Sequence, residues 1–261
     1  MTIYAVANGK GGVGKSSVAG ELLASLARVG RKPIGIDLDQ QGNFTSWVGV
    51  VDDTTIYGHA AEVLEGTATL HEVAIDAPTV PGASIVVGTH QLGGLTVQDV
   101  PDLATGLRDY LRGGIEPWTD VVIDTPPSLA GVTITALVAA DVVIAPVSME
   151  REAIEQLERL EEVLRTTVGK RMRPGARINW IVPTRYRSRG VMSREILDRL
   201  TTTYTGRVTS PIREDARVPE AYRSSRRAGR PVTLATPQTR AAADYIDAIG
   251  TIIRDKTGVA S

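Results

Sequence analysis

The amino-acid sequence predicts an α/β fold in which a mostly parallel, twisted sheet is flanked by helices. An apolar strand at residues 2–8 runs into a glycine-rich loop and a helical pattern at residues 15–29, and a second apolar strand follows at residues 32–38. A strand, a helix and a second strand in this order form a parallel crossover unit. A further apolar strand, at residues 120–124, ends in a carboxylate, which is typical of the ligand-binding edge of such sheets.

The remaining elements follow from the spacing of apolar residues and from turn residues. Apolar residues at intervals of three and four predict helices, whereas short apolar runs next to Gly or Pro predict strands. Further strands are expected at residues 84–87, 141–146 and 178–182, and further helices at residues 54–66, 99–111, 151–166 and 237–254. The last of these helices has few basic residues, so we expect it to pack on the core and not to anchor a membrane.

Length and composition favour a single domain over residues 1–261. A chain of 261 residues that is 42% hydrophobic can bury one sizeable core. We expect no secretory signal, because the first strand begins at Thr2, and no run approaches the ~18 apolar residues of a membrane span. The chain has no cysteine, which excludes disulfides and thiolate metal sites, and its three histidines show no ligand spacing.

The loop after the first strand has the sequence of a phosphate-binding loop. From Gly9 to Ser16 it fits the pattern G-x-x-x-x-G-K-[ST], in which glycines let backbone N–H groups close around phosphate oxygens. The helix that begins near Lys15 directs its N-terminal dipole at the same anion. Lys15 is expected to reach the β- and γ-phosphates, and the Ser16 hydroxyl to hold Mg²⁺. The expected nucleotide-binding residues of the loop are Gly11, Gly12, Val13, Gly14, Lys15, Ser16 and Ser17.

The same glycines leave a second interpretation open. Gly9, Gly11 and Gly14 also fit the dinucleotide-binding fingerprint, with Asp37 as the ribose-binding acid, and this would indicate a NAD-dependent oxidoreductase. A lysine and a hydroxyl directly after the third glycine favour a triphosphate and its metal, because a dinucleotide site has no use for them. Binding of NAD without Mg²⁺ would favour the oxidoreductase.

Carboxylates stand at the ends of two predicted strands. Asp37 and Asp39 are two residues apart, so we expect them to face the same crevice at the C-terminal edge of the sheet, where open α/β sheets bind ligands. Asp124 ends an apolar strand, as in the Walker B arrangement, in which the carboxylate holds Mg²⁺ directly or through a water. The sequence therefore predicts that Asp124 and Ser16 share a metal ion.

Positive charge is concentrated in one region of a chain whose net charge is −1. Residues 171–230 contain 15 Arg and no Lys against 5 Asp and Glu, a balance of +10. Such an Arg-rich region is the electrostatic footprint of a polyanion partner. No helix-turn-helix signature precedes the first strand, so binding to double-stranded DNA would be non-specific. The candidate DNA contacts are Arg185, Arg187, Arg189, Arg217, Arg223, Arg226 and Arg227.

These motifs resemble those of one family. With Lys10, the loop reads Lys-Gly-Gly-Val-Gly-Lys-Ser-Ser, which is similar to the deviant Walker A motif of the ParA and MinD ATPases, and most similar to the short, Soj-like ParA partition ATPases. The stretches 37–43, 123–128 and 211–221 resemble the family motifs DxDPQGN, IDxPPS and IPRNVRLAEA. The resemblance therefore runs along essentially the whole chain. Gln40 is a departure, since it stands where the family usually has Pro.

The resemblance implies roles for individual residues. Lys10 of one subunit would cross a dimer interface to the phosphates bound by the other subunit, and Asp39 would position or activate the attacking water. The implied catalytic residues are therefore Lys10, Lys15 and Asp39, and the implied metal residues are Ser16, Asp37 and Asp124. The resemblance also implies that Pro183, Thr184 and Pro211 lie beside the adenine.

The resemblance further implies a cytoplasmic, nucleoid-associated switch that uses ATP, ADP and Mg²⁺. Its ATP-bound homodimer would bind DNA non-specifically, and hydrolysis stimulated by a ParB-type centromere-binding protein would release the DNA. The missing cysteines exclude the related nitrogenase iron proteins. Two alternatives stay open. One is a MinD-like membrane-associated positioning ATPase, and the other is a regulatory DNA-binding protein in which hydrolysis is incidental.

Overall fold

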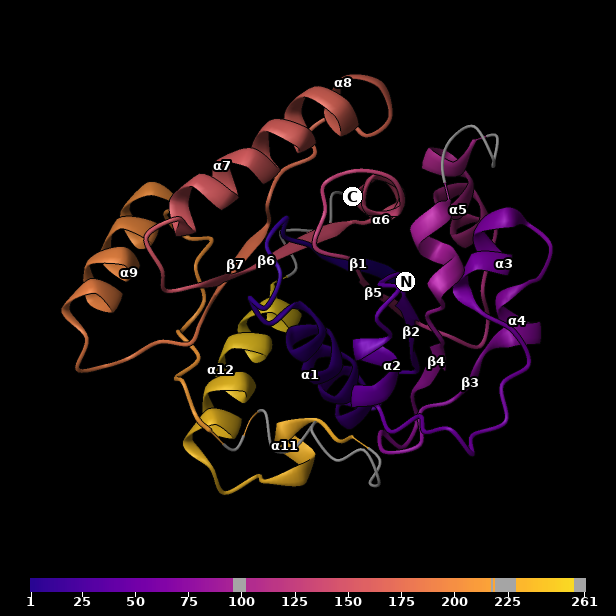
Figure 1. The fold of residues 1–261 in the computed structure, drawn as a ribbon, viewed down its shortest axis with the longest axis horizontal. Coiled ribbons are helices and arrows are strands. Elements are labelled where there is room, and N and C mark those ends of the chain that lie inside the picture. The colour runs from indigo at the N-terminus through magenta and orange to yellow at the C-terminus, as the bar shows by residue number, and fades with distance from the viewer. Residues whose placement is uncertain (96–101, 217, 219–228, 256–261) are drawn as a thin grey trace.

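A seven-stranded sheet forms the centre of the computed structural model, which describes residues 1–95, 102–216, 218 and 229–255 (Figure 1). The strands are β1 (Thr2–Val6), β2 (Pro33–Asp37), β3 (Ile75–Asp76), β4 (Ser84–Val86), β5 (Asp120–Asp124), β6 (Val142–Ser148) and β7 (Trp180–Thr184). Their order in space is β3-β4-β2-β5-β1-β6-β7. Only β3, at one edge, runs antiparallel to its neighbour β4 among these strands. The predicted mostly parallel sheet is therefore confirmed.

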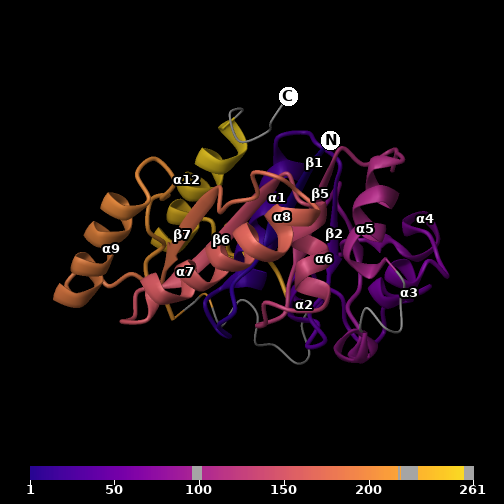
Figure 2. The same ribbon diagram turned by 90° about the horizontal axis from the view of Figure 1, so that it is seen from above.

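Helices cover both faces of the sheet, as Figures 1 and 2 show. On one face lie α1 (Lys15–Arg28), α2 (Asn43–Trp47), α11 (Val232–Ala235) and α12 (Arg240–Arg254). On the other face lie α5 (Leu103–Arg112), α6 (Val132–Ala139) and α7 (Ala153–Val163), which a π-helical turn (η2, Leu164–Val168) joins to α8 (Gly169–Arg171). The short helices α3 (Ala60–Glu65), α4 (Leu70–Val73) and η1 (His90–Gly94) lie towards the β3–β4 edge, and α9 (Val191–Thr203) lies beside β7 at the opposite edge.

Alternate side chains of each central strand point to opposite faces of the sheet and pack into two separate hydrophobic cores. In β1, Ile3 and Ala5 join the core under α5, α6 and α7, whereas Tyr4 and Val6 join the core under α1 and α12. Because both faces of a parallel sheet are covered, its strands are continuously apolar. This is why the sequence shows strands as apolar runs and not as alternating patterns.

Most predicted elements are confirmed within a few residues, but the helix expected at residues 54–66 is wrong in its first half. Helix α3 begins only at Ala60, where the Glu62 carboxylate accepts a hydrogen bond from the His59 N–H at 2.5 Å and caps the helix. Residues 54–59 form a loop. The start of the helix expected at residues 99–111 lies outside the described residues, and its described part is α5.

Sequence analysis missed the short helices α2, α4, η1 and α11, and it missed the longer helices α6 and α9 for a physical reason. Helix α6 is buried on nearly all sides, so its apolar residues show no helical period. Helix α9 buries Leu200 and packs Ile196 and Leu197 against the core. Its first turn interrupts this apolar face, because Val191 and Met192 are exposed while Ser193 is buried.

The contact between α2 and the sheet depends on a glycine in β2. A Cβ built on Gly35 would lie 2.7 Å from Phe44 Cζ and 2.7 Å from Ile85 Cδ1, closer than carbon atoms approach in folded proteins. Phe44, on α2, is fully buried there. The absence of a side chain at Gly35 therefore sets how closely α2 approaches the sheet.

We expect Gly35→Ala to destabilise the protein by about 1–3 kcal/mol, because an added methyl group overpacks this contact. The measurement is the free energy of unfolding from urea titration. The control is Gly106→Ala in α5, where an added Cβ meets nothing within 4 Å and helix propensity improves by up to about 1 kcal/mol. Equal effects at the two positions would contradict the packing argument.

Candidate functional site

The C-terminal ends of β1, β5 and β2 lie side by side and bring the candidate site residues together. In the register of the sheet, Val6 is opposite Asp124, and Asp124 is opposite Asp37. The glycine-rich loop follows β1 directly and leads into α1. Sequence positions that are more than a hundred residues apart thus meet at one edge of the sheet.

The loop between β1 and α1 is held in a fixed shape by its neighbours. Gly12 and Gly14 have φ angles of 73° and 94°, in the left-handed region that favours glycine. The Asn8 side chain donates to the Pro146 carbonyl at 2.8 Å, and the Thr184 hydroxyl donates to the Val13 carbonyl at 2.8 Å. The loop is therefore preorganised, with the N-terminus of α1 beneath it.

Lys15 and Asp124 form the buried centre of the site. Lys15 is 6% exposed, and its ammonium group donates to the Lys10 carbonyl at 3.2 Å. Burial lowers the pKa of Lys15, and the nearby carboxylates of Asp124 and Asp39 oppose this shift. Burial, and next the charge of Asp37, raises the pKa of Asp124 well above its usual range.

Both carboxylate oxygens of Asp124 are buried and have no hydrogen-bond partner among the described residues. The Ser16 hydroxyl, on the first turn of α1, is near enough to lower the pKa of Asp124 without forming a well-aligned hydrogen bond to either oxygen. A carboxylate and a hydroxyl beside a phosphate loop are the protein groups that such sites use for Mg²⁺, with phosphate and water completing the shell. Within the described residues, no group of three or more His, Cys, Asp or Glu could hold a metal by itself. The residues present therefore fit Mg²⁺ that arrives with a nucleotide.

Asp37 shapes the loop that follows β2. Its carboxylate accepts hydrogen bonds from the Thr45 N–H at 2.8 Å, the Thr45 hydroxyl at 2.7 Å and the Asp39 N–H at 3.0 Å. Burial raises the pKa of Asp37 to about 6, and these hydrogen bonds oppose the shift. Gly88 closes the other side, since a Cβ there would lie 2.8 Å from the Asp39 carbonyl oxygen.

Sequence analysis missed both Thr45 and Gly88, although the matched DxDPQGN-like stretch ends only two residues before Thr45. Asp39 itself is 5% exposed, and its carboxylate accepts from the Gln41 N–H at 3.0 Å. The loop thus fixes the position of Asp39, which lines the cavity next to the glycine-rich loop.

Lys10 lies in an ion pair within its own chain. Its ammonium group is 2.5 Å from a carboxylate oxygen of Glu150 and 3.7 Å from one of Glu152, on the turn between β6 and α7. The hydrogen bond from Lys10 to Glu150 raises the pKa of Lys10. All three side chains are more than a third exposed, so the pair is accessible to solvent.

A cavity of about 680 Å³ extends from the glycine-rich loop towards α12. Its walls include Lys15, Ser16 and Asp39. Residues that sequence analysis did not assign also line it, among them Gln41, Asn43, Trp47, Pro127, Ile212, Arg213 and Tyr245. Trp47, Ile212 and Tyr245 give one part of the cavity an apolar and aromatic wall, suited to a base or another flat ring.

One of the three residues predicted beside the adenine lines this cavity, and two do not. Pro183 and Thr184 are the last residues of β7 and not part of the loop after it, because β7 continues to pair with β6 through Val147 and Ser148. Thr184 lines the cavity, whereas Pro183 and Pro211 are not among the residues of its wall. Their role beside a base remains a prediction.

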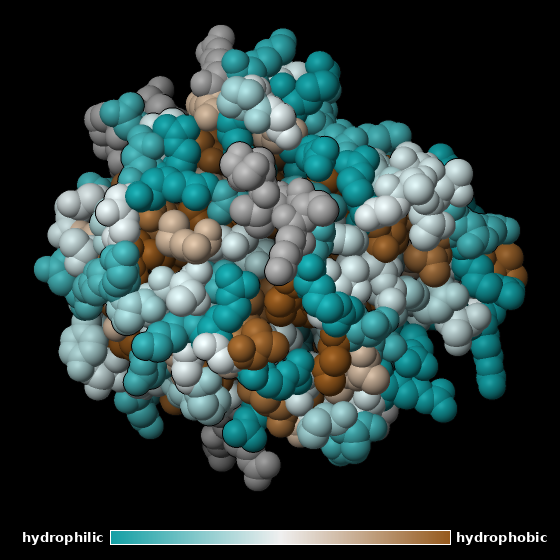
Figure 3. Space-filling view, turned by 180° about the vertical axis from the view of Figure 1, so that it is seen from behind, coloured by the Kyte–Doolittle hydropathy of each residue, from teal (hydrophilic) through white to brown (hydrophobic). Residues whose placement is uncertain are grey.

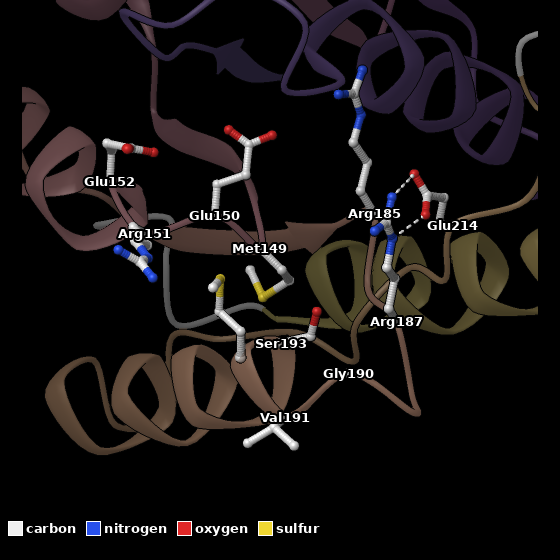
Figure 4. Close-up of a pocket in the computed structure, with 11 residues that line it drawn as sticks. Met149, Glu150, Arg151, Glu152, Arg185, Arg187, Gly190, Val191, Ser193 and Glu214 are labelled. Carbon is white, nitrogen blue, oxygen red and sulfur yellow. Dashed lines mark hydrogen bonds and ion pairs between the residues drawn. The ribbon is translucent and has the colours of Figure 1, made fainter.

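A second cavity, of about 550 Å³, lies beside the first, between the β6–α7 turn and the start of α9 (Figure 4). Arg185 lines both cavities. Arg187 lines the second and forms an ion pair with Glu214, with two N–O distances of 2.5 and 3.2 Å. Of the predicted DNA contacts, Arg185, Arg187 and Arg189 are exposed, and Arg217, Arg223, Arg226 and Arg227 lie outside the described residues.

None of the helices in the described part of the chain combines the length and the apolar character that a membrane-spanning helix needs. On the face shown in Figure 3, apolar residues form small patches between hydrophilic ones. Of the described part of α12, Ile246 is the one large apolar side chain that is clearly exposed. This agrees with its prediction as a core helix.

The fold and the site together define a P-loop nucleotide-binding protein. A parallel sheet, a glycine loop with a buried lysine, and a carboxylate at the end of the adjacent strand are the parts that this class uses for a nucleoside triphosphate and Mg²⁺. Comparisons with known proteins narrow the class. A protein-family model described as an AAA domain matches residues 1–175.

Two curated relatives cover most of the chain. The sporulation initiation inhibitor protein Soj of Bacillus subtilis is 30% identical over 248 residues, which are 94% of this chain and 95% of the relative. The chromosome-partitioning ATPase Soj of Thermus thermophilus is 37% identical over 193 residues, or 74% of this chain and 72% of the relative. The chain therefore belongs to the ParA/Soj family of P-loop ATPases. This assignment replaces the dinucleotide interpretation of the loop.

Solved structures share the fold at lower identity. The ATP complex of a Cyanothece McdA variant superposes with a TM-score of 0.81 at 17% identity, covering 98% of each chain. A cobyrinic acid a,c-diamide synthase from Mycobacterium smegmatis, solved with an ATP analogue and magnesium, gives a TM-score of 0.75 at 23% identity, covering 97% of this chain and 95% of that chain. These two structures establish the fold of the chain and not its substrate.

Replacing Asp124 by Asn should weaken Mg²⁺-dependent nucleotide binding without lowering the stability of the ligand-free protein. We expect Mg²⁺-dependent nucleotide affinity to fall by about 10- to 100-fold, because a metal-holding carboxylate is lost. The melting temperature of the ligand-free protein should not fall, because a buried charge is removed without a change of size. Isothermal titration with and without Mg²⁺ and thermal melting are the measurements. Asp76→Asn, on the exposed end of β3, is the control, and an unchanged Mg²⁺ dependence in Asp124→Asn would contradict the metal assignment.

Proposed function

We propose that this protein is a DNA-partition ATPase over residues 1–261. ATP with Mg²⁺ joins two copies of the chain, the dimer binds double-stranded DNA without sequence preference, and hydrolysis, stimulated by a ParB-type partner, releases the DNA. The protein would work in the cytoplasm at the nucleoid. The observation that carries this proposal is the buried, unpartnered Asp124 carboxylate beside Ser16 and Lys15, within the described residues of a chain similar to Soj along nearly its whole length.

In this proposal, separate groups of site residues bind the phosphates, hold the metal ion and orient the attacking water. Backbone N–H groups of residues 11–17 and the Lys15 ammonium group bind the phosphates, and Ser16 and Asp124 hold the metal ion, which neutralises phosphate charge when it is bound. Asp37 supports this shell from the next strand, mainly by fixing the loop that carries Asp39. Asp39 orients the water that attacks the terminal phosphate. Lys10 supplies a second cation to the nucleotide of the partner subunit, once it has left Glu150.

The proposal explains why two acidic residues contact Lys10 in the separate chain. A second cation beside Lys15 is repelled unless a polyanion lies between them. Glu150 and Glu152 neutralise Lys10 when no partner nucleotide is present. Hydrolysis is expected to be slow without a partner protein, as in switches that complete their sites only on binding.

The proposed DNA surface consists of exposed arginines between β7 and the middle of α9. Arg189, Arg194 and Arg199 are exposed and have no ion-pair partner among the described residues. Other arginines of the Arg-rich region are neutralised within the protein. Arg207 pairs with Glu161, and Arg213 forms a bidentate pair with Asp244. The expectation for Arg217, Arg223, Arg226 and Arg227 stays a prediction.

The MinD-like alternative differs in its binding partner. It predicts ATP-dependent flotation with liposomes, whereas the partition proposal predicts ATP-dependent binding to DNA. A purely regulatory DNA-binding protein would keep its function after hydrolysis is lost. DNA binding measured with no nucleotide, ADP, ATP and a slowly hydrolysed analogue separates these cases.

We expect Asp39→Ala to trap a stable ATP-bound dimer, because a nucleotide still binds but the attacking water is no longer oriented. Size-exclusion chromatography with light scattering gives the dimer, and phosphate release gives the turnover rate. The control is Asp53→Ala, which removes an exposed carboxylate after α2. Normal turnover in Asp39→Ala would remove the role assigned to this residue.

Replacing Arg189 and Arg194 together by Ala should weaken DNA binding and reduce the salt slope of log K against log [salt] by about 2, since each lost phosphate contact lowers it by about 1. The matched control replaces Arg159 and Arg165 of the α7–η2 segment, which are also exposed but are paired with Glu155 and Glu162. The same loss in both double variants would indicate a net-charge effect and not a DNA surface.

A further inference from the structure

Arg185, directly after β7, has a backbone conformation that is costly for a residue with a side chain. Its φ angle is 53°, in the left-handed region, and such a residue stores about 1–3 kcal/mol of strain. The backbone on both sides is fixed. Thr184 bonds to the Val13 carbonyl, and the Tyr186 N–H donates to the Ile212 carbonyl at 3.0 Å. The surroundings therefore impose a backbone conformation that glycine would adopt freely but that costs free energy for an arginine.

The guanidinium group of Arg185 lies beside the middle of the phosphate loop. Its Nη2 is 3.7 Å from the point where a Cβ of Gly12 would stand. In Figure 4 the side chain extends away from the paired Arg187 and Glu214, towards the purple ribbon of the N-terminal part of the chain. Arg185 thus belongs to the wall of the nucleotide cavity as well as to the neighbouring second cavity.

No described residue forms a hydrogen bond or an ion pair with the Arg185 side chain, in contrast to Arg187 and Arg213. The acidic residues Asp39, Glu214 and Asp215 line the same cavity. Glu214 is bound to Arg187, and the Asp39 carboxylate accepts from Gln41. The charge of Arg185 helps to lower the pKa of Glu214 and of Glu150, without forming a direct ion pair with either.

Arg185, Lys15 and the N-terminus of α1 therefore direct positive charge into one cavity. Like charges repel, so this arrangement favours a multiply charged anion between them.

We propose that Arg185 binds the phosphate chain of a nucleoside di- or triphosphate held in the phosphate loop of its own subunit, and that it is not a DNA contact. This assignment of Arg185 rests on one part of the proposed function, namely that this cavity holds a nucleotide. A guanidinium group donates two parallel N–H bonds to phosphate oxygens, which a lysine cannot reproduce. The strained backbone of Arg185 positions its guanidinium group beside the phosphate loop before a nucleotide binds.

The test compares nucleotide affinity in Arg185→Gly and Arg159→Ala by isothermal titration with ATP, ADP and AMP, in Mg²⁺ and without DNA. Arg185→Gly removes the guanidinium group and relaxes the backbone, whereas Arg159→Ala removes an equal charge from α7, where the side chain is exposed, paired with Glu155 and outside both cavities. We expect Arg185→Gly to bind ATP and ADP about 10- to 100-fold more weakly, as for a lost charge-assisted hydrogen bond, with little change for AMP. Arg159→Ala should bind all three as the wild type does, and Arg185→Lys should recover only part of the loss.

Two results would overturn the proposal. Unchanged ATP and ADP affinity in Arg185→Gly, with weaker DNA binding, would make Arg185 a DNA contact. Equal losses in Arg185→Gly and Arg159→Ala would show a long-range charge effect. If Arg185→Gly melts at a lower temperature than the wild type, Arg185→Asn, which tolerates the left-handed region, decides by the same titration. A wild-type protein that binds ATP but not DNA would contradict the partition function and leave the assignment of Arg185 intact.

Discussion

The carboxyl group of Asp124 is buried at the C-terminal edge of the sheet, and no described residue gives either of its oxygens a hydrogen bond. Burial raises its pKa well above the usual range, so its charged form requires compensation. Lys15 supplies part of it, and Mg²⁺ with a nucleotide is suited to supply the rest. The arrangement of β1, β5 and β2 serves this one constraint, because only adjacent parallel strands bring the phosphate loop, Asp124 and Asp37 to the same edge.

The sequence predicted the parts of the site that depend on short spacing. The glycine loop, Lys15, Ser16 and the strand-end carboxylates are each encoded within a few consecutive residues, and parallel strands necessarily carry them to one edge. The sheet was predictable for the same reason, since strands buried on both faces are apolar runs. Helix α6 was not, because burial on all sides removes the period that identifies a helix.

Several contacts that the sequence did not reveal act over long separations. Thr184, which sequence analysis placed beside a base, fixes the phosphate loop from 171 positions away, and Gly88 closes against the Asp39 loop only after β4 has paired with β2. Likewise, nothing in the local sequence distinguishes Arg187, which pairs with Glu214, from Arg185, which reaches the phosphate loop. Charge composition predicts that a region is basic, but the partner of each arginine is set by tertiary contacts. The fold itself is shared with a diamide synthase, so function has to be argued from the site and from close relatives.

The contact of Lys10 with Glu150 and Glu152 has an energetic consequence for assembly. Ion pairs between such solvent-exposed side chains contribute only about 0–1 kcal/mol, and salt weakens them further. In the proposed dimer, withdrawing the lysine from its own chain would therefore remove little of the free energy of association. The pair restrains a flexible cation in the separate chain, yet it would be only a small thermodynamic barrier to bringing two subunits together.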